Sequence, residues 1–121
     1  TQEPETMRDK VELKKIHFEF DKYRLTDEAK ELLAENSRML RNNPRIKILI
    51  EGHCDERGTI EYNLALGERR AQSAKNYLMS LGIAENRINI ISYGKERPMD
   101  LGQGEEAWSQ NRRDEFVITV Q

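Results

Sequence analysis

The stretch "RIKILIEGHCDERGTIEYNLALGERRAQSAKNYLMSLG", residues 45–82, decides the fold of this chain. Its first eight letters place an isoleucine at every second position, which is the period of a β-strand with one buried face. After a polar loop, alanines and leucines recur at helical spacing up to Gly82, a typical C-terminal stop. We therefore predict a strand, a loop and then a helix from about Asn63 to Ser80, which is the building unit of an α/β fold.

The rest of the chain continues this alternation. "KIHFEFD" has the period of a half-buried strand, and Thr26 is placed to be the N-cap of a helix that "NNP" at 42–44 ends. "RINIISYG" and "DEFVITV" are typical of two more strands, with a short helix expected around 105–110 in the polar segment between them.

This order predicts an α/β (α+β) two-layer sandwich in which a small mixed β-sheet carries its helices on one face. The helices would cover the apolar side of the strands. The residues that we expect to contribute to the core are Ile16, Phe18, Phe20, Ile46, Ile48, Ile50, Ile88, Ile90, Phe116 and Ile118.

Composition limits the possible functions. The 121 residues carry 20 basic and 22 acidic side chains, interleaved along the chain, for a formal net charge of −2. A nucleic-acid partner requires a concentrated basic face, so we do not expect DNA or RNA to be bound. No window of about 18 apolar residues occurs, so we expect the chain as given to be soluble.

The ends and the single cysteine give less information. Residues 1–10, "TQEPETMRDK", have no apolar period, so we expect a flexible N-terminal tether there and a folded domain over 11–121. A cytosolic protein and a mature fragment that has lost its signal both remain open. Cys54 has no partner for an intramolecular disulfide, and we expect a buried thiol.

Polar groups gather where the strand at 45–52 ends. Asp55 lies in the loop, while Asn63, Gly67 and Arg70 fall on one stripe of the helix, where Gly67 would leave a hollow. A carboxylate binds an ammonium group, a guanidinium binds a carboxylate, and an amide can do either, so these groups suit a zwitterion. We expect Asp55 and Arg70 to be exposed at the rim, although the spacing equally allows the two to pair with each other at the surface.

Four blocks of the sequence closely resemble the outer membrane protein A-like (OmpA-like) peptidoglycan-binding domain: "FEFDKYRLTDEA", "EGHCDERGTIEYNLALGERRAQSAKNYL", "ISYGKERP" and "SQNRR". The resemblance runs from about Ile16 to Val120. Within the family, "DERG" and "YNLALGERRA" are most similar to the peptidoglycan-associated lipoprotein (Pal) branch, and porin-type and flagellar-motor-type members are the alternatives. The resemblance implies a non-catalytic module that holds the peptide stem of peptidoglycan by meso-diaminopimelate.

The same resemblance implies a role for individual residues. The acid of the "H-x-D" loop, Asp55, would bind the ammonium group of diaminopimelate, and the arginine before alanine in the helix, Arg70, would bind its carboxylate. No cofactor is implied. Cys54 departs from the small or hydroxyl residue expected between the His and the Asp. The remaining positions of the implied pocket are Phe20, Asp21, Arg57, Asn63 and Leu66.

The resemblance further implies a place in the cell envelope. A lipidated cysteine upstream of this chain would anchor it to the outer membrane of a Gram-negative bacterium, on the periplasmic side. A Tol-system periplasmic β-propeller protein would be a partner, in a system that acts in envelope integrity and cell division.

Three other interpretations fit less of the sequence. His53, Cys54 and Asp55 are metal-ligand types, but adjacent side chains on a loop diverge and no second cluster exists, so we expect no metal. A peptidoglycan hydrolase needs two facing carboxylates, one with a raised pKa, or a nucleophile and base that cannot be assembled here, so we expect no enzyme activity. Arg112 and Arg113 suit the segment before the last strand or the pocket rim better than a nucleic-acid contact.

Overall fold

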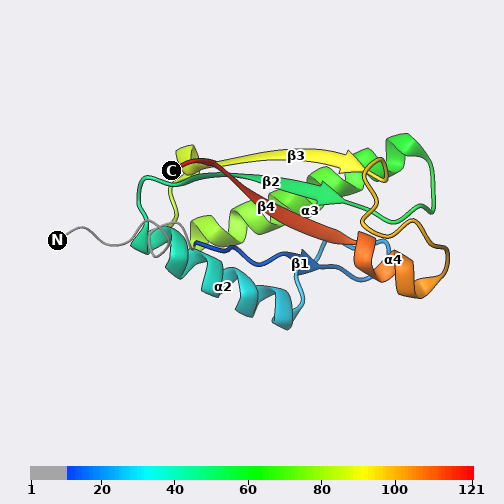
Figure 1. Cartoon of the computed structure of the whole chain (residues 1–121), viewed down its shortest axis with the longest axis horizontal. Helices are drawn as coiled ribbons and strands as arrows, with labels where there is room; N and C mark the ends of the chain where they lie inside the picture. The colour runs from blue at the N-terminus through cyan, green and yellow to red at the C-terminus, as the bar shows by residue number, and fades with distance from the viewer. Residues whose placement is uncertain (1–10) are drawn as a thin grey trace.

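The computed structural model describes residues 11–121, and the tether expected over 1–10 lies outside the described residues. The helices and strands follow one another as in Figure 1. They are β1 (Ile16–His17), α2 (Asp27–Asn42), β2 (Lys47–His53), α3 (Ile60–Ser80), the 3-10 helix η1 (Glu85–Arg87), β3 (Ile88–Gly94), α4 (Glu105–Asn111) and β4 (Arg113–Val120).

The four strands form one mixed sheet in the order β1-β4-β2-β3. β4 runs antiparallel to β1 and β2, whereas β2 and β3 are parallel and are connected by the crossover through α3. α3 packs on β2, β3 and β4, and α2 packs on α3 and β1, so helices form one layer and strands the other (Figure 1). The predicted two-layer sandwich is confirmed.

The alternation read from the sequence sets the buried face of the sheet. Ile48 and Ile50 of β2 are fully buried and lie in register with isoleucines of β3 and with Ile118 and Phe116 of β4. Lys47, Leu49 and Glu51, on the opposite face, are only partly buried or exposed, because no helix covers that side. A strand period of two therefore predicted the core correctly along β2.

The first strand is shorter than predicted. Only Ile16 and His17 pair with β4, and one more backbone hydrogen bond follows, from the Phe18 N–H to the Arg112 carbonyl at 2.9 Å. Phe18 stays buried, but the chain then turns, with Asp21 in the left-handed region at φ 58°. This turn leaves Phe20 52% exposed, so its predicted place in the core is wrong.

Two threonines fix where the long helices begin. The Thr26 hydroxyl accepts a hydrogen bond from the backbone N–H of Ala29 at 3.1 Å, which confirms the predicted N-cap of α2. Thr59 accepts from the N–H of Tyr62 at 3.0 Å and starts α3 at Ile60 rather than near Asn63. The earlier start adds a turn of α3 at the end of β2 where the polar residues gather.

Gly67 serves packing rather than a hollow beside the ligand groups. A Cβ at Gly67 would lie 2.9 Å from the carbonyl oxygen of Gly52, and a Cβ at Gly52 would overlap the carbonyl oxygen of Gly67. The backbones of α3 and β2 therefore touch at this pair. The close approach holds the first turns of α3 against the end of β2 and fixes the distance between the groups that each carries.

Candidate functional site

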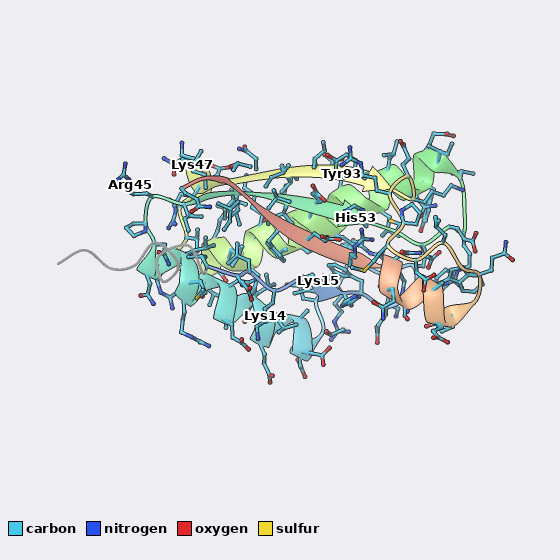
Figure 2. The ribbon with its side chains drawn as sticks, in the orientation of Figure 1. Lys14, Lys15, Arg45, Lys47, His53 and Tyr93 are labelled. Atoms are coloured by element: carbon cyan, nitrogen blue, oxygen red, sulfur yellow. The ribbon has the colours of Figure 1, made fainter. Side chains whose placement is uncertain are left out.

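A cavity of about 220 Å³ lies at the C-terminal end of β2. Figure 2 shows His53 and Tyr93 at this end of the sheet and Arg45 and Lys47 at the opposite end. The cavity is built from the turn after β1, the loop after β2 and the first half of α3. All seven residues of the predicted site line it, together with Cys54, Gly58 and Tyr62: Phe20, Asp21, Asp55, Arg57, Asn63, Leu66 and Arg70.

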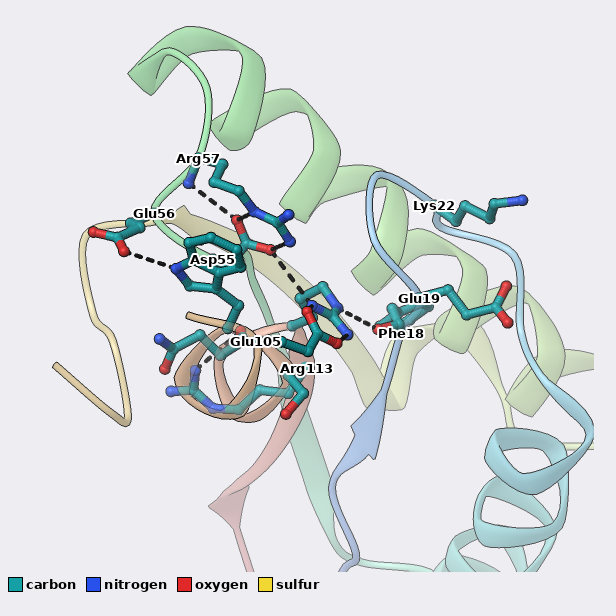
Figure 3. A network of polar contacts seen from close by, with 12 residues as sticks. Phe18, Glu19, Lys22, Asp55, Glu56, Arg57, Glu105 and Arg113 are labelled. Atoms are coloured by element: carbon teal, nitrogen blue, oxygen red, sulfur yellow. Dashed lines mark hydrogen bonds and ion pairs between the residues drawn. The ribbon is translucent and has the colours of Figure 1, made fainter. Parts of the chain in front are cut away.

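The Asp55 carboxylate is held by arginines of the protein. Its Oδ1 accepts from the backbone N–H and the Nε of Arg57 at 3.0 and 3.2 Å, and its Oδ2 accepts from the same guanidinium at 2.8 Å (Figure 3). A carboxylate has about four acceptor sites, so one site on Oδ2 is left for another donor. Asp55 is only 4% exposed, and the prediction of an exposed rim group is wrong.

The ionisation of Asp55 follows from these contacts. Burial by itself would raise the pKa of the carboxyl group. Hydrogen bonds and charge from Arg57, with a smaller contribution from Arg112, outweigh burial and hold the pKa below its usual range. Asp55 is therefore negatively charged at neutral pH and can attract a cation.

Arg57 is fixed between two aromatic rings. Its guanidinium carbon lies 3.8 Å from the ring centre of Phe20 and 3.9 Å from that of Trp108, which is typical of cation–π contacts. The Trp108 indole N–H donates to the Glu56 carboxylate at 2.7 Å (Figure 3). The loop after β2, the turn after β1 and α4 are thus joined around the arginine that orients Asp55.

Arg112 supports the same carboxylate from behind. Its Nε donates to the Phe18 carbonyl at 2.8 Å, its two terminal nitrogens pair with Glu105 at 3.1 and 2.9 Å, and it lies 3.7 Å from Asp55 Oδ2. The hydrogen bonds from Arg112 lower the pKa of the Glu105 carboxyl group. Arg112 therefore connects α4 and β1 to the site, as a residue placed before the last strand can do.

Arg70 is buried, with 1% of its surface exposed, so its predicted rim position is wrong. Its three nitrogens donate to the carbonyls of Lys22 at 2.8 Å, His53 at 3.0 Å and Glu19 at 3.1 Å. A guanidinium has five N–H groups, which leaves two without a partner among residues 11–121. Burial lowers the pKa of Arg70, yet a guanidinium stays charged because its ordinary pKa is far above neutrality.

Asp55 and Arg70 do not pair with each other. Among residues 11–121, the ion pairs of Asp55 are with Arg57 and Arg112, and the hydrogen bonds of Arg70 go to backbone carbonyls. The alternative of a surface ion pair between the two is therefore wrong. The Asp55 carboxylate and the Arg70 guanidinium therefore line one cavity without forming an ion pair with each other.

Asn63 and Cys54 complete the floor of the cavity. The Asn63 side-chain N–H groups donate to the carbonyls of Arg57 at 2.8 Å and Thr59 at 3.0 Å, which leaves only the amide oxygen for a ligand. The Cys54 thiol donates to the backbone carbonyl of Asn63 at 3.3 Å. Burial raises the pKa of this thiol to about 11, so it stays protonated and acts as a small apolar group.

Asp114 of β4 is an unusual buried acid behind the cavity. It is fully buried, and neither of its carboxyl oxygens has a hydrogen-bond partner among residues 11–121. Burial raises the pKa of this carboxyl group well above its usual range, and the charge of Arg70 offsets this only partly. Burial therefore favours the protonated, uncharged form of Asp114.

The described part of the chain gives no metal-binding group. Within residues 11–121, no three His, Cys, Asp or Glu side chains are placed to hold an ion together. The His53 ring stacks on Tyr93 and its Nε2 contacts Glu51 at 3.1 Å. No helix in the same range is long and apolar enough to cross a membrane.

The sequence and the fold of this chain both have counterparts among known proteins. The sequence model of the OmpA family matches residues 17–112. The chain belongs to the OmpA family. The matched range runs from the second residue of β1 to the end of α4 and contains every residue that lines the cavity, so the site lies inside the family domain.

Relatives of this OmpA-family chain carry one name. A protein of Haemophilus influenzae named peptidoglycan-associated lipoprotein is 46% identical over 81% of this chain and 64% of its own length. The protein of that name in Brucella melitensis is 46% identical over 86% of this chain and 62% of its own length. The matched region thus spans less than two thirds of these relatives.

Solved structures show the same OmpA-family architecture. The peptidoglycan-associated lipoprotein from Burkholderia pseudomallei superposes with a TM-score of 0.84 at 42% identity, covering 87% of this chain and 89% of that one. The C-terminal domain of Helicobacter pylori MotB gives a TM-score of 0.83 at 18% identity, covering 91% and 87%. The second likeness shows the fold alone.

Sequence reasoning missed two side chains of this OmpA-family site, Tyr62 and Trp108. Tyr62 lines the cavity and donates its hydroxyl proton to the Asp21 carboxylate, whereas Trp108 acts through Arg57. Tyr62 could have been found from its position one residue before Asn63. Trp108 could not, because only the folded chain brings α4 beside the loop after β2. Arg112 was expected before the last strand or at the pocket rim, and the structure places it beside Asp55.

Proposed function

We propose that this chain is a non-catalytic binding domain that holds the peptide stem of peptidoglycan by the zwitterionic end of meso-diaminopimelate. The observation that carries the proposal is one cavity with a carboxylate and a guanidinium held apart, each with bonding capacity left. The names of relatives at 46% identity support the choice of peptidoglycan as the ligand.

Each end of the zwitterion has a complementary group. The ligand ammonium would donate to the open site on Asp55 Oδ2 and to the amide oxygen of Asn63. The ligand carboxylate would accept from the two remaining N–H groups of Arg70. Phe20 and Leu66 would contact the methylene chain, and the Asp21 carboxylate adds negative charge on the ammonium side.

The protein contacts of these groups favour affinity. Asp55, Asn63 and Arg70 are all buried and hydrogen-bonded before any ligand arrives. Binding therefore orders few side chains, and fixed polar groups lower the entropic cost of association. Arg57 contributes by orienting Asp55, with its guanidinium held between Phe20 and Trp108.

The carboxyl groups argue for binding without hydrolysis. A glycosidase needs a carboxylic acid with a raised pKa that faces a second carboxylate across the substrate. The pKa of Asp55 is lowered, and the acid with a strongly raised pKa, Asp114, is fully buried and does not line the cavity.

At the level of the cell, we propose a tether between outer membrane and cell wall. A lipid anchor upstream of this chain would hold it on the periplasmic side, and a Tol-system β-propeller protein would be its partner in envelope integrity and cell division. The 46% identity to peptidoglycan-associated lipoproteins favours this role over that of a porin-type or flagellar-motor-type member of the family.

Calorimetric titration with stem peptides tests the ligand assignment. The peptide L-Ala-γ-D-Glu-meso-diaminopimelate would be compared with the same peptide carrying L-lysine, which keeps the ammonium group but lacks the distal carboxylate. We expect the lysine peptide to bind about 10- to 100-fold more weakly, because two buried donors of Arg70 lose their acceptor.

Protein variants test the other end of the ligand. Asp55→Asn should weaken binding of the diaminopimelate peptide at least about tenfold, since the ammonium loses its counter-charge. Arg45→Gln, at the opposite end of the molecule, is the matched control and should bind like the unmodified chain (Figure 2). Equal binding of both peptides, or no binding of either, would overturn the proposal.

A further inference from the structure

A second cavity of about 160 Å³ adjoins the first. Asp21, Tyr62 and Leu66 line both cavities, so the two are neighbours that share these side chains. The Tyr62 hydroxyl donates to Asp21 Oδ1, and this pair forms the ridge between them. The second cavity is completed by residues outside the predicted site: Tyr23, Ala65 and Arg69.

Arg69 brings an unengaged positive charge to this cavity. Its side chain is exposed, and its described contact is with the ring of Tyr23, whose centre lies 5.5 Å from the guanidinium carbon. Among residues 11–121, no ion pair includes Arg69. The neighbouring Arg70 has the same side chain but donates to three carbonyls of the protein. Of these two arginines, Arg69 is the one whose side-chain N–H groups have no hydrogen-bond partner among residues 11–121.

The lining matches the last residue of a peptide. The guanidinium of Arg69 can bind a carboxylate in bidentate geometry. Asp21 keeps one oxygen free of the Tyr62 hydroxyl and can accept from a peptide N–H, while its negative charge disfavours a carboxylate at that wall. Ala65 and Leu66 offer a small apolar surface that a short apolar side chain can contact.

We propose that this second cavity is a subsite for a small carboxy-terminal residue that follows the diamino acid in the stem, with its free carboxylate held by Arg69 beside Tyr23. The inference rests on the proposed function, because the first cavity must hold the diamino acid. In peptidoglycan the residue at that place is D-alanine, whose carboxylate is free in an uncrosslinked stem and becomes an amide in a crosslink. The domain should therefore prefer stems that end in a free carboxylate.

Three synthetic peptides distinguish the contributions of the two cavities to binding. They are the tripeptide L-Ala-γ-D-Glu-meso-diaminopimelate, the tetrapeptide that adds D-alanine, and the same tetrapeptide as its C-terminal amide. Calorimetry is done near 0.15 M salt, where charges farther than about 8 Å are screened. We expect the tetrapeptide acid to bind about 5- to 10-fold tighter than the amide, as a charge-assisted contact allows.

Variants assign that ratio to Arg69. In Arg69→Gln the acid and amide should bind equally, while the tripeptide should bind as it does to the unmodified chain. Arg45→Gln removes an arginine far from both cavities and should keep the ratio, which controls for net charge. Thermal melts establish that both variants are folded.

The outcomes distinguish the subsite from the proposed function. If the tripeptide binds but the acid and amide bind equally to the unmodified chain, or if Arg69→Gln keeps their ratio, the subsite is wrong and the proposed function stands. If none of the three peptides binds, the proposed function fails and the subsite fails with it. A ratio that is lost in Arg69→Gln and kept in Arg45→Gln supports the subsite.

Discussion

The burial of Arg70 makes it a structural residue as well as a candidate ligand group. Arg70→Ala would remove a charged donor from three carbonyls, those of Lys22, His53 and Glu19, of which Glu19 keeps the backbone N–H of Lys22 at 3.2 Å. A hydrogen bond to a charged group is worth about 1.5–3 kcal/mol, but the carbonyls of Lys22 and Glu19 lie in an exposed turn where water can replace the guanidinium. We therefore expect the free energy of unfolding to fall by about 2–4 kcal/mol.

The adjacent Arg69 provides a matched control. It has the same side chain in the same helix but is exposed, so Arg69→Ala should change stability by no more than about 0.5 kcal/mol. Urea unfolding followed by helix circular dichroism and by the fluorescence of Trp108, the single tryptophan, measures both variants. The midpoint of thermal unfolding should fall by about 10–15 °C in Arg70→Ala.

A difference of less than about 0.5 kcal/mol between the two variants would refute this reasoning, because it would mean that the three carbonyls find equivalent partners without Arg70. The measured loss of stability also decides how a ligand-binding experiment with Arg70→Ala is interpreted. Binding must be measured well below the thermal midpoint of that variant, since loss of binding by an unfolded chain says nothing about the guanidinium.

Two further predictions concern packing around the site. Burial raises the pKa of Asp114, so the folded chain holds this proton to a higher pH than the unfolded chain, in which Asp loses it near about pH 4. The free energy of unfolding should therefore fall as the pH rises from about 4 toward 7. Asp114→Val, similar in size, should reduce this dependence and raise stability at pH 7 by about 1–3 kcal/mol, and a lower thermal midpoint at pH 7 would contradict the account. Gly52→Ala should cost more than about 3 kcal/mol or prevent folding, because the added Cβ overlaps the Gly67 carbonyl oxygen. Gly102→Ala, whose added Cβ would lie 3.1 Å from the flexible Asp100 side chain, is the control, and equal thermal midpoints for the two glycine variants would argue against the backbone contact.

Most of the fold could be predicted from local pattern. The alternation along 45–52 predicted β2 and its buried face, and Thr26 and Gly82 marked helix ends, because these depend on neighbouring residues and on backbone conformation. The errors arose where a distant segment decides. Phe18 and Phe20 follow the same alternation, yet only Phe18 is buried, because the chain leaves the sheet in a turn at residues 19–22.

In the candidate site, too, some features were predictable from the local sequence and others depend on contacts between distant segments. Residue types and spacing identified the groups that line the cavity, with Asp55 and Arg70 among them. Their burial, their separate partners and the contact of Gly52 with Gly67 depend on how α3 lies across β2. No local rule predicts that an arginine on an amphipathic helix donates to carbonyls of a turn and of a strand end.

The sequence by itself determined the mixed α/β architecture, the chemical types of the ligand groups and their order along the chain, because periodicity and side-chain chemistry are local properties. Other features depend on the tertiary structure: Trp108 of α4 stacks on Arg57, and Arg112 at the end of α4 lies beside Asp55. It is also the tertiary structure that leaves Asp55 and Arg70 unpaired with each other and places Arg69 at a second cavity. These facts depend on contacts between segments far apart in the chain. Such contacts are set by the packing of the whole core. The close contact of the Gly52 and Gly67 backbones, for example, positions α3 on β2 and with it the side chains that α3 carries.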